Sequence, residues 1–110
     1  MTEKYIYWLI LSLAGLFEVG WAVSMKFSEG FTNLKWSLIT ILLLVISMLG
    51  LAISLKELPV GTAYSVWTGI GAVGTAALGI ILFKESADFW RIFFILMIVC
   101  GIVGLKVVTK

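Results

Sequence analysis

The chain has 110 residues, of which 62% are hydrophobic and 13% are charged. A soluble domain is normally about 45–50% apolar and about 25% charged, so this composition excludes an ordinary water-soluble fold and indicates an integral membrane protein. The net charge of +2 and the dispersed basic residues give no indication of a nucleic-acid partner. Histidine is absent and Cys100 is the only cysteine, so the sequence predicts no disulfide, metal site or cofactor within one chain.

The first predicted helix covers residues 5–26. Its apolar run exceeds the 7–15 residues of a signal peptide and lacks a small-residue cleavage site, so we interpret it as a retained membrane span. Glu18 is the only charged residue between Tyr5 and Met25. A charged side chain near the centre of a bilayer costs roughly 2.5–3.5 kcal/mol and usually marks a functional site. We therefore hypothesise that Glu18 binds a cation or a proton.

The helical neighbours of Glu18 combine small residues with one large ring. Ala14, Gly15 and Trp21 fall on its face at spacings of three and four residues. Gly15 is therefore a candidate pocket-lining or hinge residue. An indole face attracts a desolvated cation by about 1–2 kcal/mol, which makes Trp21 a candidate binding residue. Membrane packing is the alternative explanation for Trp21.

The second predicted helix covers residues 34–56 and has no charge from residue 36 to residue 55. Ser47 is the hydroxyl nearest the middle of this span, at the depth expected for Glu18. Its side chain either lines the site or bonds back to its own helix. Pro59 follows in the next loop and suits the first turn of a new helix.

The third predicted helix covers residues 60–83 and is free of charge. Tyr64, Trp67 and Gly71 share one stripe of this helix. Trp67 lies about two turns inside the span, deeper than an interfacial belt residue, and Tyr64 has a hydroxyl that can donate a hydrogen bond to the acid. These two aromatic residues are therefore candidates for the site, with membrane packing as the alternative.

The segment Gly69–Gly74 matches the G-x-G-x-x-G pattern of dinucleotide-binding proteins. That pattern requires a preceding strand and a βαβ unit, whereas this copy lies inside a charge-free apolar span. We interpret the glycines as a close helix contact through Gly71 and as a flexible point at Gly69 and Gly71, although static packing explains them equally well.

The fourth predicted helix covers residues 89–108. Only 14 uncharged residues run from Ile92 to Leu105, but Trp90 and Lys106 are suitable interfacial anchors and extend the span, and Lys106 can snorkel. Gly101 and Gly104 predict a contact surface for the fourth helix of a partner chain.

The short loops leave no soluble domain, so residues 1–110 form a single predicted membrane domain. No nucleophile–base pair is visible, and no enzyme activity is expected. Because four helices enclose little interior in which to hide a carboxylate, we expect a homo-oligomer, most simply a dimer.

The basic residues divide equally between the two predicted sides of the membrane. Four lie on the side of the termini and the second loop, and four lie on the side of the first and third loops: Lys4, Lys56, Lys106 and Lys110 against Lys26, Lys35, Lys84 and Arg91. The chain therefore has no positive-inside bias. Either it inserts in both orientations, which permits an antiparallel dimer, or the balance is a coincidence of small numbers.

Three segments carry a resemblance to a known family: Ala14–Ala22 around the acid, Leu58–Gly74 in the third helix and Gly101–Lys106 in the fourth. They resemble the small multidrug resistance transporters, and the guanidinium exporter subtype in particular, along the whole chain. The segment Lys26–Phe31 looks more like the multidrug branch of that family.

The resemblance implies an all-α integral membrane protein of the cell (inner) membrane, with four transmembrane helices per chain and an antiparallel, dual-topology homodimer. Two Glu18 carboxylates would share one pocket, with Trp21, Ser47, Tyr64 and Trp67 as its polar and aromatic lining. The implied activity is proton-coupled antiport that exports guanidinium ion and small substituted guanidinium compounds. The alternatives are a multidrug exporter of quaternary ammonium or hydrophobic cations and, in a different class, a small pore or assembly subunit.

Overall fold

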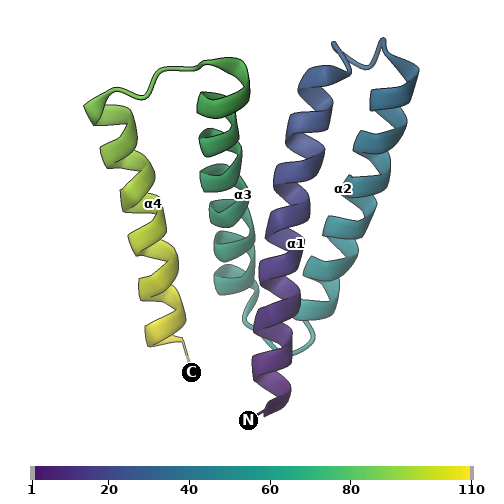
Figure 1. Cartoon of the computed structure of the whole chain (residues 1–110). Coiled ribbons are helices and arrows are strands. Elements are labelled where there is room, and N and C mark those ends of the chain that lie inside the picture. The colour runs from purple at the N-terminus through teal and green to yellow at the C-terminus, as the bar shows by residue number, and fades with distance from the viewer. Residues whose placement is uncertain (1, 110) are drawn as a thin grey trace.

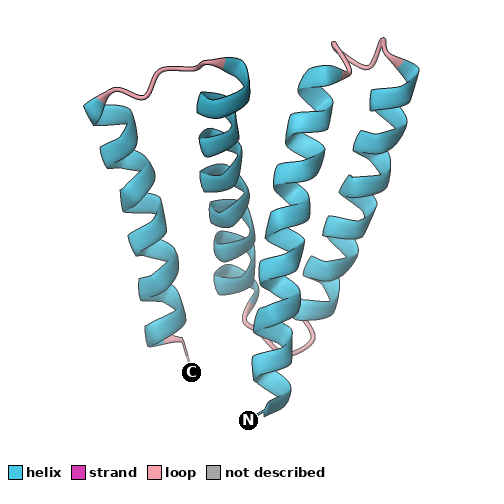
Figure 2. Cartoon of the chain, in the orientation of Figure 1, coloured by secondary structure: helices cyan, strands magenta, loops and turns pink. Residues whose placement is uncertain are grey.

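The computed structural model describes residues 2–109 and contains four helices joined by short loops (Figure 2). Each helix is long and apolar enough to cross a membrane, which confirms the four predicted apolar spans. The helices are α1 (Thr2–Phe27), α2 (Leu34–Ser54), α3 (Val60–Phe83) and α4 (Phe89–Val108).

Successive helices run in opposite directions. The α1–α2 and α3–α4 loops lie at one end of the bundle, whereas both chain ends and the α2–α3 turn lie at the other (Figure 1). α1 packs against both α2 and α3, and α4 packs against α3. The side chain of Lys4 and all of Lys110, which enter the charge count above, lie outside the described part of the chain.

Polar side chains define where two helices begin. The Asn33 side chain accepts a hydrogen bond of 3.2 Å from the Trp36 N–H and caps α2. Asp88 caps α4 in the same way, through a 2.9 Å bond from the Arg91 N–H.

α2 ends at Ser54, two residues before the predicted end at residue 56. Pro59 disfavours a helical conformation at Leu58, which precedes it. The chain instead turns, and the Leu58 N–H donates to the Ser54 carbonyl at 3.0 Å. This turn starts α3 directly after α2.

Small residues allow α1 and α2 to approach closely. A Cβ added to Gly50 of α2 would lie 2.8 Å from the Cβ of Ala14 on α1. Thr40, Ser47 and Ser54 are fully buried on α2 at intervals of seven residues, and their hydroxyls donate to backbone carbonyls. The Ser47 bond crosses to α1, and the Ser54 hydroxyl also lies 3.4 Å from the Tyr7 carbonyl of α1, whereas the Thr40 bond stays within α2. In a bilayer, close van der Waals packing and interhelical hydrogen bonds hold helices together, because lipid provides no hydrophobic driving force between them.

α4 is the peripheral helix, and none of its residues is buried. A Cβ added to Gly101 or Gly104 would meet no atom within 4 Å. Lys106 reaches back to α1, where its ammonium lies 5.1 Å from the centre of the Trp8 ring. One long apolar face of α4 is therefore left open by the single chain.

Candidate functional site

Glu18 lies in the middle of α1, on the side that faces α3. Its carboxylate rests against Gly71, and an added Cβ at that glycine would overlap the carboxylate group. Oε1 of Glu18 is buried and accepts no hydrogen bond from the described residues 2–109. A buried acceptor without a donor is energetically costly, so binding of a proton or of another hydrogen-bond donor to this oxygen would be favourable.

Trp21 follows Glu18 by three residues on the same face of α1. Its indole Nε1 is also buried and also lacks a partner among the described residues. One unsatisfied acceptor and one unsatisfied donor therefore lie on neighbouring positions of one helix face. A polar ligand could form hydrogen bonds with both of these unsatisfied atoms.

Ser47 joins three helices. Its hydroxyl donates to the Ala14 carbonyl of α1 at 2.6 Å and accepts from Trp67 Nε1 of α3 at 2.9 Å. Ser47 is fully buried, and Trp67 is 6% exposed. Of the two alternatives for Ser47, the bond back to its own helix is not the one formed: the hydroxyl bonds to α1 and α3. The hydroxyl acts as a bridge that holds the Trp67 indole in place, and Trp67 lies one turn before Gly71, the residue that contacts the Glu18 carboxylate.

Tyr64 lies one turn before Trp67 on α3, and the two ring centres are 5.7 Å apart. Its side chain is 56% exposed. The hydrogen bond that Tyr64 could donate to the acid is not formed to Oε1 of Glu18, which has no partner within residues 2–109. In the single chain, Tyr64 extends the aromatic surface of Trp67 outward instead of contacting the acid.

The glycines predicted to line the pocket or act as hinges, which are Gly15, Gly69 and Gly71, lie at close contacts. An added Cβ at Gly15 would lie 2.8 Å from Ile70 of α3, and one at Gly69 would lie 2.8 Å from Ile102 of α4. Gly71 gives its space to the Glu18 carboxylate. Gly15 and Gly69 therefore allow close helix packing and Gly71 leaves room for the Glu18 carboxylate, while a hinge role for them stays a prediction.

Sequence reasoning missed the backbone carbonyl of Ala14 as the acceptor for Ser47. It also missed the buried hydroxyls of Thr40 and Ser54, which share one stripe of α2 with Ser47. Their spacing of seven residues was the available signal for a helix face that packs against a neighbour.

Comparison with known proteins gives a consistent family assignment. Residues 6–98 match the model of the family described as Small Multidrug Resistance protein. The guanidinium exporter of Proteus vulgaris is 54% identical over 102 residues, which are 93% of this chain and 98% of that protein. The guanidinium exporter of Escherichia coli K12 is also 54% identical, over 93% of this chain and 97% of its own length.

The guanidinium exporter of Salmonella typhimurium is 56% identical over 99 residues, which are 90% of this chain and 94% of that protein. The family match covers most of the chain, and these relatives share nearly its full length. This chain belongs to the small multidrug resistance family.

Proposed function

We propose that this chain exports guanidinium ions in exchange for protons, with Glu18 as the binding site that both share. It is a multi-pass inner-membrane transporter and not an enzyme. Its relatives with 54–56% identity are named guanidinium exporters. The observation that carries the proposal is the buried Oε1 of Glu18, which has no hydrogen-bond donor within the described chain.

Burial explains why proton and cation transport would be coupled. A charged carboxylate in an apolar surrounding is unfavourable, and either a proton or a bound cation removes that penalty. Both ligands need the oxygens of Glu18, so one must leave before the other binds. Competition at a single carboxylate, combined with alternating access to the two sides of the membrane, would therefore exchange protons for cations.

Guanidinium suits the groups around Glu18. It is planar, and its parallel N–H donors form a two-point hydrogen bond with a carboxylate. Gly71 has no side chain and so leaves room for the Glu18 carboxylate itself. The indoles of Trp21 and Trp67 supply aromatic faces for a cation, and the Ser47 bridge holds the second indole in place.

The proposed functional unit is an antiparallel homodimer with Gly101 and Gly104 at its contact. The open face of α4 supports it, because small residues with no neighbour within 4 Å permit a second helix to approach closely. The equal division of basic residues between the two sides supports insertion in both orientations. In such a dimer the two open states are equivalent, which makes alternating access nearly isoenergetic.

Guanidinium uptake into proteoliposomes with an imposed pH gradient tests this function. The wild-type chain is expected to accumulate guanidinium with the gradient, and Glu18→Gln is expected to abolish that flux. Glu57→Gln is the matched control, because Glu57 is an exposed carboxylate in the α2–α3 turn.

Retained gradient-driven flux in Glu18→Gln would contradict the proposal. Current without proton coupling would indicate a pore. Quaternary ammonium flux without guanidinium flux would indicate the multidrug activity instead.

A further inference from the structure

A groove of about 390 Å³ lies between α1 and α3 and extends to the α3–α4 loop and the first turn of α4. Ala22 and Ala72 line its inner part. Ala22 lies one helical turn beyond Glu18, and Ala72 follows Gly71, the residue that contacts the carboxylate. The outer part is lined by Lys26, Glu85 and Arg91. The groove therefore runs from about one helical turn beyond Glu18 to a charged mouth at the α3–α4 loop.

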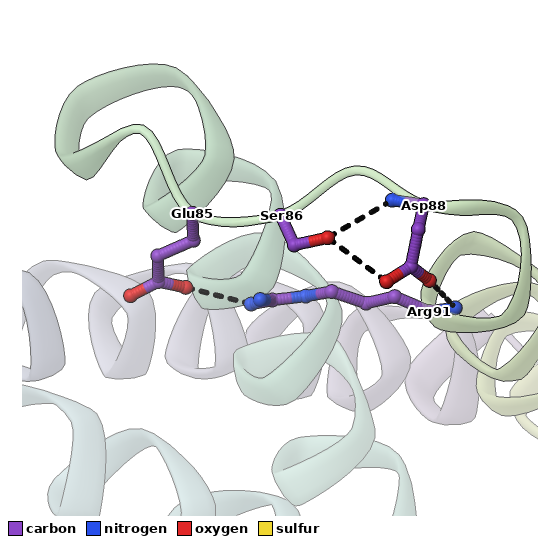
Figure 3. A network of polar contacts seen from close by, with 4 residues as sticks. All are labelled: Glu85, Ser86, Asp88 and Arg91. Atoms are coloured by element: carbon purple, nitrogen blue, oxygen red, sulfur yellow. Dashed lines mark hydrogen bonds and ion pairs between the residues drawn. The ribbon is translucent and has the colours of Figure 1, made fainter.

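The mouth contains the one ion pair found among the described residues. The Arg91 guanidinium contacts Oε1 of Glu85 at 2.6 Å (Figure 3). The Arg91 side chain is 34% exposed and that of Glu85 is 42% exposed, so a cation from solution can reach both. The Glu85 carboxylate lies against Gly79 of α3, where an added Cβ would overlap it.

Backbone geometry holds Glu85 over the groove. Lys84 adopts a left-handed conformation with φ of 55° and ends α3. The Glu85 N–H then donates to the Gly79 carbonyl at 3.2 Å, which turns the chain back toward α3. This turn places the carboxylate beside the helix that lines the groove.

The other acidic residue of this loop, Asp88, caps the N-terminus of α4. Asp88 accepts from the Arg91 N–H at 2.9 Å and from the Ser86 hydroxyl at 2.9 Å (Figure 3). These two bonds hold the pKa of Asp88 below its usual range, so it stays charged as the helix cap. Glu85 is therefore the only carboxylate that lines the groove.

The charges at the mouth of the groove make Glu85 the residue that allows a cation to bind there. Lys26 and Arg91 also line the groove, and the Lys26 ammonium lies 5.7 Å from the centre of the Phe83 ring. Without Glu85 the lining would carry only positive charge and would repel a cation. With Glu85 present, a cation can enter only by competing with Arg91 for the same carboxylate.

Arg91 itself carries a guanidinium group, which is the chemical group of the proposed substrate. Guanidinium and the Arg91 side chain make the same fork of N–H donors toward a carboxylate. We propose that Glu85 is an outer guanidinium-binding site, at which the transported ion exchanges with the side chain of Arg91 before or after it visits Glu18. This inference rests on guanidinium being a substrate, as proposed above.

Guanidinium transport by reconstituted variants tests the outer site, with KM as the readout. Glu85→Gln removes the acceptor, and because an exposed ion pair contributes little, KM is expected to rise about two- to fivefold. Arg91→Gln removes the competitor and is expected to lower KM by a similar factor. In the double variant the KM should match that of Glu85→Gln.

Two further variants serve as an independent test and as a control for the KM measurements. Glu85→Asp keeps the charge on a shorter side chain and should give an intermediate KM, even if Glu85→Gln folds poorly. Glu57→Gln is the matched control, because Glu57 borders a different surface cavity and forms no ion pair within the described chain; its KM should equal that of wild type.

The opposite directions of the two KM shifts distinguish binding from structure. If the ion pair only stabilises the loop, Glu85→Gln and Arg91→Gln would change KM and the folded fraction in the same direction, and the outer site would be wrong. A wild-type protein that carries no guanidinium at all would overturn the proposed function and the outer site together.

Discussion

Replacing Ser47 with alanine probes the bridge that joins three helices. The variant removes the hydroxyl that donates to the Ala14 carbonyl at 2.6 Å and accepts from Trp67 Nε1 at 2.9 Å. Both bonds are buried. The shape of the core changes little, because serine and alanine differ by one oxygen atom. The effect therefore measures the hydrogen bonds themselves.

The expected loss of stability follows from these two bonds. An interhelical hydrogen bond in a membrane protein contributes about 0.6 kcal/mol on average and at most about 1.7 kcal/mol. The variant also leaves the Trp67 N–H buried without an acceptor, which costs about 1–3 kcal/mol. Since these contributions overlap, we expect Ser47→Ala to reduce the free energy of unfolding by about 1–3 kcal/mol.

Unfolding of the purified protein in mixed micelles, followed by tryptophan fluorescence, measures this change. Ser12→Ala is the matched control, because its hydroxyl bonds to the Trp8 carbonyl of the same helix at 3.0 Å. That control should change the unfolding free energy by less than about 0.5 kcal/mol. In a Trp67→Phe background, which lacks the indole N–H, Ser47→Ala should cost about 0.6–1.7 kcal/mol less.

Equal losses for Ser47→Ala and Ser12→Ala would refute the bridge. An additive double variant would show that Trp67 and Ser47 do not interact. Either result would also remove the reason to regard the Trp67 indole as held in place by Ser47.

Two other substitutions test the contact between α3 and Glu18 and the proposed dimer contact on α4. Gly71→Ala places a methyl group where the Glu18 carboxylate lies, so the KM for guanidinium should rise and the free energy of unfolding should fall by about 1–3 kcal/mol. Flux and unfolding measurements check these two effects. Gly61→Ala is the control, because an added Cβ there meets no atom within 4 Å, and it should leave both quantities unchanged. Gly104→Leu should weaken the proposed dimer and increase the monomer fraction seen by cross-linking in membranes; an unchanged fraction would place the contact elsewhere.

Three of the helices could be predicted because their apolar runs are long enough to span a membrane and are bounded by charges or Pro59, whereas the fourth reaches that length only when its interfacial anchors Trp90 and Lys106 are included. The end of α2 was less predictable. Residues 55–58 have the composition to continue the helix, and only the conformational restriction before Pro59 explains the turn. Periodicity gives the faces of helices but not the residues at which they stop.

The residues of the candidate site could be predicted from the sequence, but the contacts between them could not. A lone acid in an apolar span, with Trp21 one turn away, is visible in the sequence. The partner of Ser47 is not, because a hydroxyl can donate to any nearby carbonyl and the relative depth of α1 and α2 decides which one. The Glu85–Arg91 pair crosses a loop at a spacing of six residues, which no helical pattern indicates.

The polar groups of the site divide into satisfied and unsatisfied sets, and this division supports the proposed exchange. Ser47 and Trp67 complete their hydrogen bonds within one chain and form a rigid wall. Glu18 and Trp21 each keep one buried polar atom without a partner in the described part of the chain. If Glu18 were also tied to Ser47, a substrate would have to break a protein bond before binding. Because its oxygen is left open, a proton or a cation gains a full interaction on arrival, and the empty charged state is the one that the membrane disfavours most.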